Sequence, residues 1–292
     1  MKRKRFALGS VVIFLFALLV TLPILFMITN SFMSIREAEN RYTSSVTPYN
    51  YLHSKEGEHY AEATLVPDVL TVSSYRDALL GNQTTLRLFW NSVLLAVPIL
   101  IGQLLVSPLA AYAFEVMRFR GKEVLYFLYI IVMLMPLQLL MVPHYIAAEA
   151  LGYNNTYWAI ILPSVFAPFG TFLLRQQLKG LDRSQLEAAR IEGASEWQVF
   201  RRAVLPSVRP TMAALTVLTF ADCWNIVDQA VVFITNSFNE PLSVYLSRLI
   251  TDDSGTIFAT ACVYMFPAVL IFLWGHDSMV HGITLSSMEA RT

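Results

Sequence analysis

The most constraining feature of this chain is a series of long apolar stretches that carry almost no charge. A helix needs roughly 20 predominantly apolar residues to cross the hydrocarbon core of a membrane. Six segments fit such helices: Phe6 to Ile35, Leu88 to Phe114, Val124 to Ala148, Ala150 to Leu174, Ser254 to His276, and Val208 to Thr235, the last interrupted only by Asp222 and Asp228. The sequence therefore predicts an all-α membrane protein with six transmembrane helices.

The composition argues against an ordinary soluble protein. Hydrophobic residues make up 55% of the 292 residues, and charged residues only 14%, against about 25% in a typical soluble domain. The 21 basic and 21 acidic residues balance, so no net positive charge would attract nucleic acid. Two cysteines, Cys223 and Cys262, cannot build a disulfide-rich scaffold or supply a zinc site alone. We expect membrane lipid, and not nucleic acid, around this chain.

Lys and Arg are unevenly distributed over the connecting segments. With the N-terminus inside, fifteen fall in cytoplasmic segments and six in outer segments. Because cytoplasmic loops carry the excess of these residues, both termini are expected in the cytoplasm. The first apolar stretch is longer than the roughly 7–15 apolar residues of a signal peptide, so it should remain as an uncleaved anchor.

These assignments divide the chain into four parts. Residues 1–33 form an N-terminal anchor span, and residues 34–87 form an extracytoplasmic loop or small lobe whose composition indicates no activity. Residues 88–276 form a five-span core that includes a cytoplasmic loop over 175–209. Residues 277–292 form a cytoplasmic tail.

The loop over 175–209 carries ordered helix signals. Ser184 with Glu187, and Ser195 with Gln198, each have the spacing of a capping box, in which a Ser side chain and an acidic or amide side chain cap the first helical turn reciprocally. Two short helices are therefore predicted between Leu181 and Pro206, a segment that we call the hairpin.

Gly193 lies between the two predicted helices, where a helix that ends in a left-handed residue favours glycine. Pro206 is expected to stop the second helix before the next span. The hairpin also offers apolar side chains for contact with a partner: Leu186, Ile191, Trp197 and Phe200.

The hairpin sequence resembles a known signature. The run Glu187-Ala188-Ala189-Arg190-Ile191-Glu192-Gly193-Ala194-Ser195, followed by Trp197, Phe200 and Leu205-Pro206, is similar to the E-A-A-x3-G signature of membrane subunits of bacterial ABC importers. Further runs look like the second permease subunit of carbohydrate-uptake systems of the maltose-permease type: Ala110 to Phe114, Arg118 to Gly121, Pro136 to Gln138, Asn155 to Tyr157, and Phe172 to Gln176. The resemblance extends from about Val72 to the C-terminus.

The resemblance implies a function as well as a fold. It implies a multi-pass permease subunit in a bacterial cytoplasmic membrane, which translocates a carbohydrate, most simply an oligosaccharide, delivered by an extracytoplasmic solute-binding protein. The implied partners are a second homologous permease and two cytoplasmic ATPase subunits, which hold ATP and Mg. The chain itself would be no enzyme and would bind no cofactor or metal.

The implied coupling residues, which would meet the ATPase, are Glu187, Ala188, Ala189, Gly193, Trp197 and Phe200. The residues alone agree on one point. The one Gly-Lys pair, Gly121-Lys122, has Val116 at the earlier position where a phosphate-binding loop needs glycine, so the chain lacks its own Walker A site.

Polar residues interrupt the apolar segment from Val208 to Thr235. Asp222, Asn225 and Asp228 recur at a spacing of three, which places them on nearly one face of a helix, beside Trp224. A charged residue within a membrane should face a cavity or a protein partner, and we take these four residues as candidates for the substrate path. The alternative is that Asp228 is solvated near the outer mouth while Asp222 bonds a neighbouring helix.

Two other classes of function stay open. A proton- or ion-driven secondary transporter would not need the hairpin, and an integral membrane enzyme would need acids, bases or metal ligands clustered at one membrane depth. Recovery of a P-loop ATPase with the purified chain would favour the importer. The sugar, a preference for a glycerol phosphate instead, and the role of the outer segment are not determined by the sequence.

The uneven distribution of Lys and Arg generates a prediction about topology. A cysteine introduced by Ser54→Cys or Ser237→Cys should react with a membrane-impermeant thiol reagent added to intact cells, because both positions lie in outer segments. A cysteine introduced by Ser195→Cys should react only after the cells are opened. The opposite labelling pattern would contradict the orientation.

Overall fold

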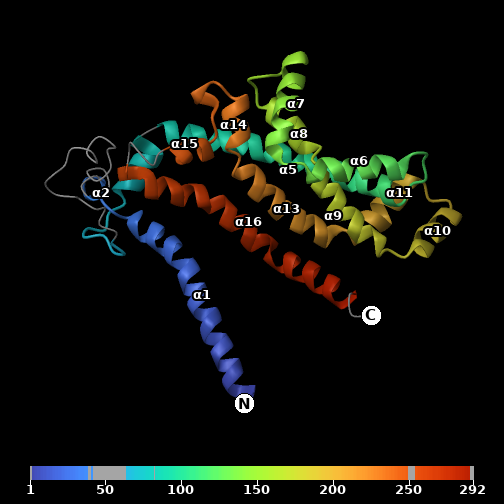
Figure 1. Cartoon of the computed structure of the whole chain (residues 1–292), viewed down its shortest axis with the longest axis horizontal. Coiled ribbons are helices and arrows are strands. Elements are labelled where there is room, and N and C mark those ends of the chain that lie inside the picture. Colours follow the sequence, from blue (N-terminus) through green and yellow to red (C-terminus); the bar gives the residue numbers. More distant parts are fainter. Residues whose placement is uncertain (1, 39–40, 42–63, 82, 249–253, 290–292) are drawn as a thin grey trace. The chain divides into compact units, whose positions relative to one another are not determined.

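The structure is a computed structural model that describes residues 2–38, 41, 64–81, 83–248 and 254–289. The secondary structure of this part of the chain is helical, apart from an isolated antiparallel bridge between Met33 and Leu70. Two compact units are present: Met1–Phe89 with Leu242–Phe266, and Trp90–Pro241 with Pro267–Thr292. Figure 1 shows the helices of both units along the chain.

The first unit contains the N-terminal helix α1, Lys2–Asn30. From Val11 to Val20 its side chains are all exposed and all apolar, as expected for a helix in contact with lipid. The Asn30 side-chain amide donates to the carbonyl oxygen of Thr64 at 3.1 Å. Phe26 packs edge-on against Phe258 of α16, Ser254–Glu289, with ring centroids 5.9 Å apart.

The predicted outer segment, residues 34–87, is described only in part, because residues 39–40, 42–63 and 82 lie outside the described residues. It contains α2, Ile35–Ala38, α4, Ser73–Arg76, and the π-helical turn η2, Asp77–Gly81. Arg41 forms ion pairs with Glu37 at 3.1 Å and with Asp68 at 2.6 Å. These contacts hold together the two ends of the segment that surround residues 42–63.

The second unit contains most of α5, Gln83–Glu115. The helices that follow are α6, Lys122–Leu134, α7, Leu137–Ala150, α8, Trp158–Val165, α9, Pro168–Lys179, α10, Arg183–Ile191, α11, Glu196–Val199, η3, Phe200–Val204, α12, Leu205–Ser207, α13, Arg209–Trp224, α14, Asp228–Phe233, and η4, Ser237–Asn239. Helix α15, Leu242–Arg248, returns to the first unit.

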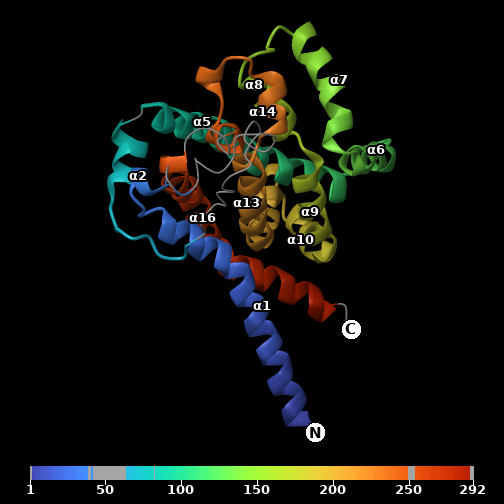
Figure 2. The same cartoon turned by 60° about the vertical axis from the view of Figure 1, so that its left-hand side comes forward.

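In the described residues, four helical segments are long and apolar enough to cross a membrane: Val11–Asn30, Gln83–Glu115, Trp158–Lys179 and Thr256–His276. Two bent pairs add up to two more. Helices α6 and α7 meet at 110°, and Glu196–Ser207 meets α13 at 71°. Figures 1 and 2 both show α7 turning sharply away from α6. Counting each bent pair as one span gives six in total, but the second pair includes the hairpin stretch Glu196–Ser207, whereas the predicted sixth span, Val208 to Thr235, covers α13 and α14.

A proline accounts for the bend between α6 and α7. Pro136 stands between α6 and α7 with ψ at 140°, an extended conformation, and its ring nitrogen has no hydrogen to donate to a preceding carbonyl. The expected continuous span from Val208 to Thr235 is wrong in detail. Helix α13 ends at Trp224, and α14 begins only at Asp228.

One hydrophobic core of the second unit joins the hairpin to the membrane helices. It contains Ala111 and Tyr112 of α5, Leu174 and Leu178 of α9, Leu186, Val199, Phe200 and Val204 of the hairpin, and Val208 and Leu215 near and in α13. Burial of these side chains removes apolar surface from water, at about 25 cal/mol per Å². The hairpin is thus a packed part of the unit.

Helices α5 and α8 approach each other closely at Gly102. A Cβ atom at this position would lie 2.4 Å from Cγ2 of Val165, closer than any ordinary contact. The close approach therefore depends on the absence of a side chain at Gly102.

This contact generates a prediction about stability. Gly102→Ala should destabilise the protein by about 1–3 kcal/mol, because the added methyl group overpacks the contact. The double variant Gly102→Ala with Val165→Ala should recover much of the loss, because the colliding methyl groups are removed. Thermal unfolding of the purified chain in detergent measures both, and a double variant less stable than both single variants would contradict the contact.

Candidate functional site: the hairpin and the membrane cavity

The turn of the hairpin ends α10 in a Schellman motif. The amide of Ala194 donates to the carbonyl of Ala189, and the amide of Gly193 donates to the carbonyl of Arg190, both at 3.0 Å. These bonds satisfy carbonyls at the end of the helix and require a left-handed residue between them. Gly193 has φ at 86°, which confirms the predicted conformation.

The helix starts agree only in part with the prediction. The capping box of Ser195 and Gln198 is confirmed, with both reciprocal bonds present. The one expected at Ser184 and Glu187 is wrong, because Asp182 is the N-cap and accepts from the backbone amide of Ser184 at 2.9 Å. Hydrogen bonds from the amide and hydroxyl of Ser184 lower the pKa of Asp182 below its usual value.

The second helical stretch of the hairpin also ends differently from the prediction. It extends from Glu196 to Ser207, so Pro206 lies inside it and does not stop it. Pro206 occupies the first turn of α12, where its missing N–H costs little. The chain bends at Val208, one residue beyond the helical stretch, before Pro210 in the first turn of α13.

The hairpin has an inner face and an outer face. Leu186 and Phe200 are only 3% and 5% exposed and belong to the core. Ile191 and Trp197 are 86% and 61% exposed, and the Trp197 ring stacks on Phe200 with centroids 5.5 Å apart. Of the other predicted coupling residues, Glu187, Ala188 and Gly193 are exposed and Ala189 is half-buried. The predicted contact residues therefore divide into an anchoring set and an outward set.

A polar contact joins the hairpin to α5. The Tyr112 hydroxyl donates to Oε2 of Glu196, and its ring packs against Phe200 with centroids 5.4 Å apart. Arg190 donates two hydrogen bonds to the same carboxylate, from Nε to Oε1 at 2.9 Å and from Nη2 to Oε2 at 3.1 Å. One carboxylate of α11 therefore joins both hairpin helices to the end of α5.

A second carboxylate makes a parallel connection. Glu115, the last residue of α5, accepts from Nε of Arg175 in α9 at 3.0 Å and from Nη2 of Arg183 in α10 at 2.8 Å. The Arg175 guanidinium also lies over the Tyr126 ring of α6, 3.5 Å from its centroid. The Glu115 and Arg175 side chains are both buried, and together they tie α5, α6, α9 and the hairpin at one point.

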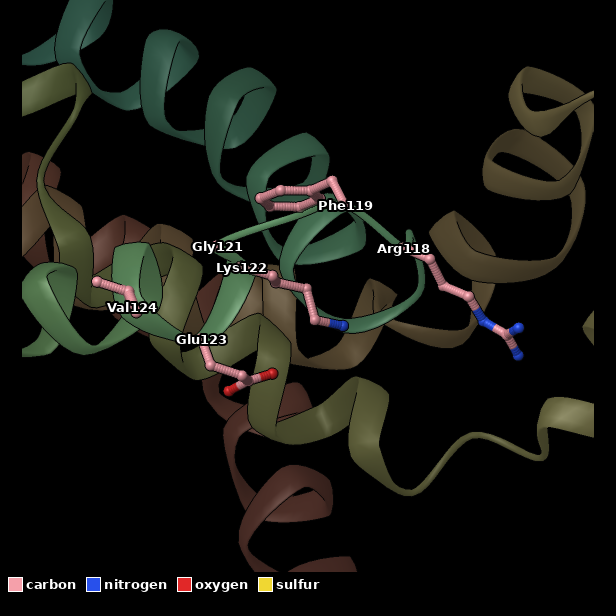
Figure 3. Close-up of a pocket in the computed structure, with 6 residues that line it drawn as sticks. All are labelled: Arg118, Phe119, Gly121, Lys122, Glu123 and Val124. Atoms are coloured by element: carbon pink, nitrogen blue, oxygen red, sulfur yellow. The ribbon is translucent and has the colours of Figure 1, made fainter.

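A hollow of about 350 Å³ lies beside this point, at the turn between α5 and α6. Figure 3 shows its residues, with the Arg118 side chain pointing away from Glu123. The Lys122 ammonium donates to the carbonyl oxygen of Met117 at 3.3 Å, and Gly121 has φ at 81°. The Gly-Lys pair of the sequence thus closes a turn.

A larger cavity of about 890 Å³ lies among α5, α6, α7, α8, α9, α13 and α14 of the second unit. Its volume is within the roughly 300–1,000 Å³ of ligand sites. Asp222, Asn225 and Asp228 all line it, although they share no helix face. Asp222 is in the last turn of α13, Asn225 caps that helix, and Asp228 begins α14. The break between the helices brings the three to one cavity.

Trp224 is placed elsewhere. It is buried and stacks on Phe220 with centroids 5.1 Å apart, and it is not among the residues lining the cavity. At the cavity wall, the side-chain amide of Gln103 donates to the carbonyl of Ser164 at 2.9 Å, and the Thr219 hydroxyl donates to Oε1 of Gln103 at 2.8 Å. These two bonds connect α5, α8 and α13.

Sequence reasoning assigned no role to Glu115, Glu196 or Tyr112. One signal was present, since Glu115 is an acidic residue at the end of an apolar span, where a charge needs a partner. The distance between Glu115 and its partners along the chain, 60 and 68 residues, hid them.

Residues 88–278, well over half of the chain, match the family described as "Binding-protein-dependent transport system inner membrane component". The chain belongs to this family. This permease is therefore a multi-pass inner-membrane transport subunit and not an enzyme, as predicted. The cytoplasmic placement of its termini stays a prediction.

The proteins similar to this permease include two relatives and one solved structure. The arabinooligosaccharides transport system permease protein AraQ of Halalkalibacterium halodurans is 29% identical, over 69% of this chain and 73% of the relative. The lactose transport system permease protein LacG of Rhizobium radiobacter is 30% identical, over 67% and 72%. A bacterial ABC transporter involved in import of the acidic polysaccharide alginate matches with a TM-score of 0.75 and 20% identity, over 94% of this chain and 96% of that one, which shows the shared fold.

The Glu115 contacts generate a prediction about two arginines that share one carboxylate. Arg175→Gln should cost about 3–5 kcal/mol in the free energy of unfolding, because it leaves a buried carboxylate without its buried partner. Arg183→Gln should cost less than about 1 kcal/mol, because the Arg183 side chain is 73% exposed. Thermal unfolding of both variants in detergent tests the difference, and equal losses would contradict it.

Proposed function

We propose that this permease is one of two homologous transmembrane subunits of an ATP-driven ABC importer for carbohydrate. In this proposal two cytoplasmic ATPase subunits bind ATP and Mg, and an extracytoplasmic solute-binding protein delivers the sugar. The names of AraQ and LacG, each a permease of a saccharide transport system, support the carbohydrate assignment.

The observation that carries the proposal is the two-faced hairpin. Its inner face is fixed to α5 and α9 by Leu186, Phe200 and two shared carboxylates, and its outer face presents Glu187, Ile191 and Trp197. Exposed large apolar side chains on a rigid segment indicate a protein partner. A motor subunit that moves this outer face would therefore move the helices to which the inner face is attached.

Helix α5 gives this movement a route to the cavity. Glu115 and Tyr112 contact the hairpin end, and Gln103 and Ile99 line the cavity. At 1.5 Å per residue, Gln103 lies about 18 Å along the helix from Glu115. Pro108 lies between them and removes one backbone hydrogen bond. We infer that closure of the ATPase reaches the substrate path through α5.

A secondary transporter is the less favoured candidate. It needs no outward apolar hairpin, whereas an importer subunit needs one. An integral membrane enzyme is excluded by the family of the chain.

Coupling is tested by the hairpin glycine. Gly193→Val places a β-branched side chain at a left-handed residue and should redirect α10 relative to α11. The importer reconstituted with this variant should lose most of the ATP hydrolysis that the loaded binding protein stimulates. Alternatively, less ATPase subunit should co-purify with the variant permease. Glu187→Ala, which removes an exposed charge from the outer face, should produce a smaller loss of the same kind.

Two matched controls separate coupling from folding. Gly152 also has a left-handed backbone, with φ at 74° and open space around it, but it lies in the loop between α7 and α8. Gly152→Val should therefore impose a similar backbone strain at its own position and leave stimulated ATP hydrolysis intact. Glu192→Ala, which removes another exposed carboxylate, is the control for Glu187→Ala. Normal hydrolysis, ATPase recovery and solute uptake in both Gly193→Val and Glu187→Ala would refute the proposed function.

A further inference from the structure

The membrane cavity carries charge of one sign. Asp222 and Asp228 line it, and among its described lining residues none is Lys or Arg. His144 is the one side chain there that could become positively charged. The Asp222 and Asp228 side chains are both exposed within the unit, so their carboxyl groups face the cavity that they line. The formal charge of the described lining is therefore negative.

The other polar groups of the lining suit hydroxyl groups. Gln103, Ser164, Thr219, Asn225 and Gln229 supply amides and hydroxyls, which donate to and accept from neutral partners. The remaining surface is apolar or aromatic and includes Phe166 and Phe169. This combination of carboxylates, neutral polar groups and aromatic rings offers acceptors to sugar hydroxyls and surfaces to sugar ring faces.

We propose that this cavity selects uncharged saccharides and rejects anionic ones. An incoming carboxylate or phosphate would meet two like charges, and the described lining of this chain offers it no Lys or Arg to pair with. A neutral hydroxyl, in contrast, forms a charge-assisted hydrogen bond with either aspartate. This inference rests on the proposed function, because it assumes that the solute passes this cavity. The proposal narrows the class of substrate. In sequence the chain resembles permeases of lactose and arabinooligosaccharide transport systems, and in fold it resembles an importer of the acidic polysaccharide alginate.

The sign of the field can be measured without knowledge of the natural sugar. Ala221 lines the cavity next to Asp222, and Ala221→Cys adds a small thiol there, in a background with Cys223→Ala and Cys262→Ala. The purified importer, with its partner subunits, is treated with a cationic trimethylammonium-ethyl methanethiosulfonate or an anionic sulfonato-ethyl methanethiosulfonate. Ser237→Cys, exposed and outside the cavity lining, is the reference that corrects for the intrinsic rates of the reagents.

The expected result is a corrected preference for the cationic reagent of about tenfold, because both aspartates line the same cavity as the thiol. Asp222→Asn with Asp228→Asn should reduce this preference to about twofold or less. In the variant that keeps both aspartates, 1 M salt should also reduce it, because the Debye length falls to about 3 Å. This salt measurement needs no change at the aspartates, so it holds even if the double variant folds poorly. A corrected ratio near one, or one that favours the anionic reagent, would overturn the inference.

The substrate class is tested separately by calorimetry on the solute-binding protein of the same system. Neither a mannuronate trisaccharide nor sn-glycerol 3-phosphate should bind, and binding of either would overturn the inference. Those results would leave the importer assignment intact. That assignment fails only if the hairpin variants keep normal stimulated hydrolysis, ATPase recovery and uptake.

Discussion

The arrangement of the second unit depends on the ion pairs that the Glu115 carboxylate forms. A buried charge is tolerated only when it is paired, and Glu115 finds its partners in Arg175 of α9 and Arg183 of α10. Tyr126 of α6 completes the site by lying against the Arg175 guanidinium. Four helices are thereby fixed at the same end of α5, and the hairpin is fixed with them.

The hairpin is built on this fixed point. Its core side chains, Leu186 and Phe200, pack beneath it, and Tyr112 attaches Glu196 from the same helix end. The π-helical segment Phe200–Val204 belongs to this packing, since Phe200 and Val204 at its two ends are both buried. Ile191 and Trp197 lie on the opposite face and are largely exposed, although the Trp197 ring also stacks on Phe200. Their exposure is the observation on which the proposed ATPase partner rests.

Local patterns predicted local structure well. The glycine at 193 and the Ser195 capping box were predictable because a helix end depends on residues within one turn. Ser184 was mistaken for a cap because Asp182, two residues earlier, competes for the same amide. The Glu115 ion pairs were not predictable, since they join residues far apart in sequence. The convergence of Asp222, Asn225 and Asp228 was expected for the wrong reason: a helix break brings them to the cavity, and a continuous helix face does not.

The polar contacts that hold α5 to its neighbours differ in strength along the helix. At the cavity it is held to α8 and α13 by neutral hydrogen bonds of the buried Gln103, and leaving a buried partner of such a bond unsatisfied costs about 1–3 kcal/mol. At its other end, leaving the Glu115 or Arg175 charge without a partner costs about 3–5 kcal/mol. The polar contacts of α5 are therefore easier to break beside the cavity than at the end that meets the hairpin. A gate with this gradient can part at the cavity while its attachment to the hairpin stays closed.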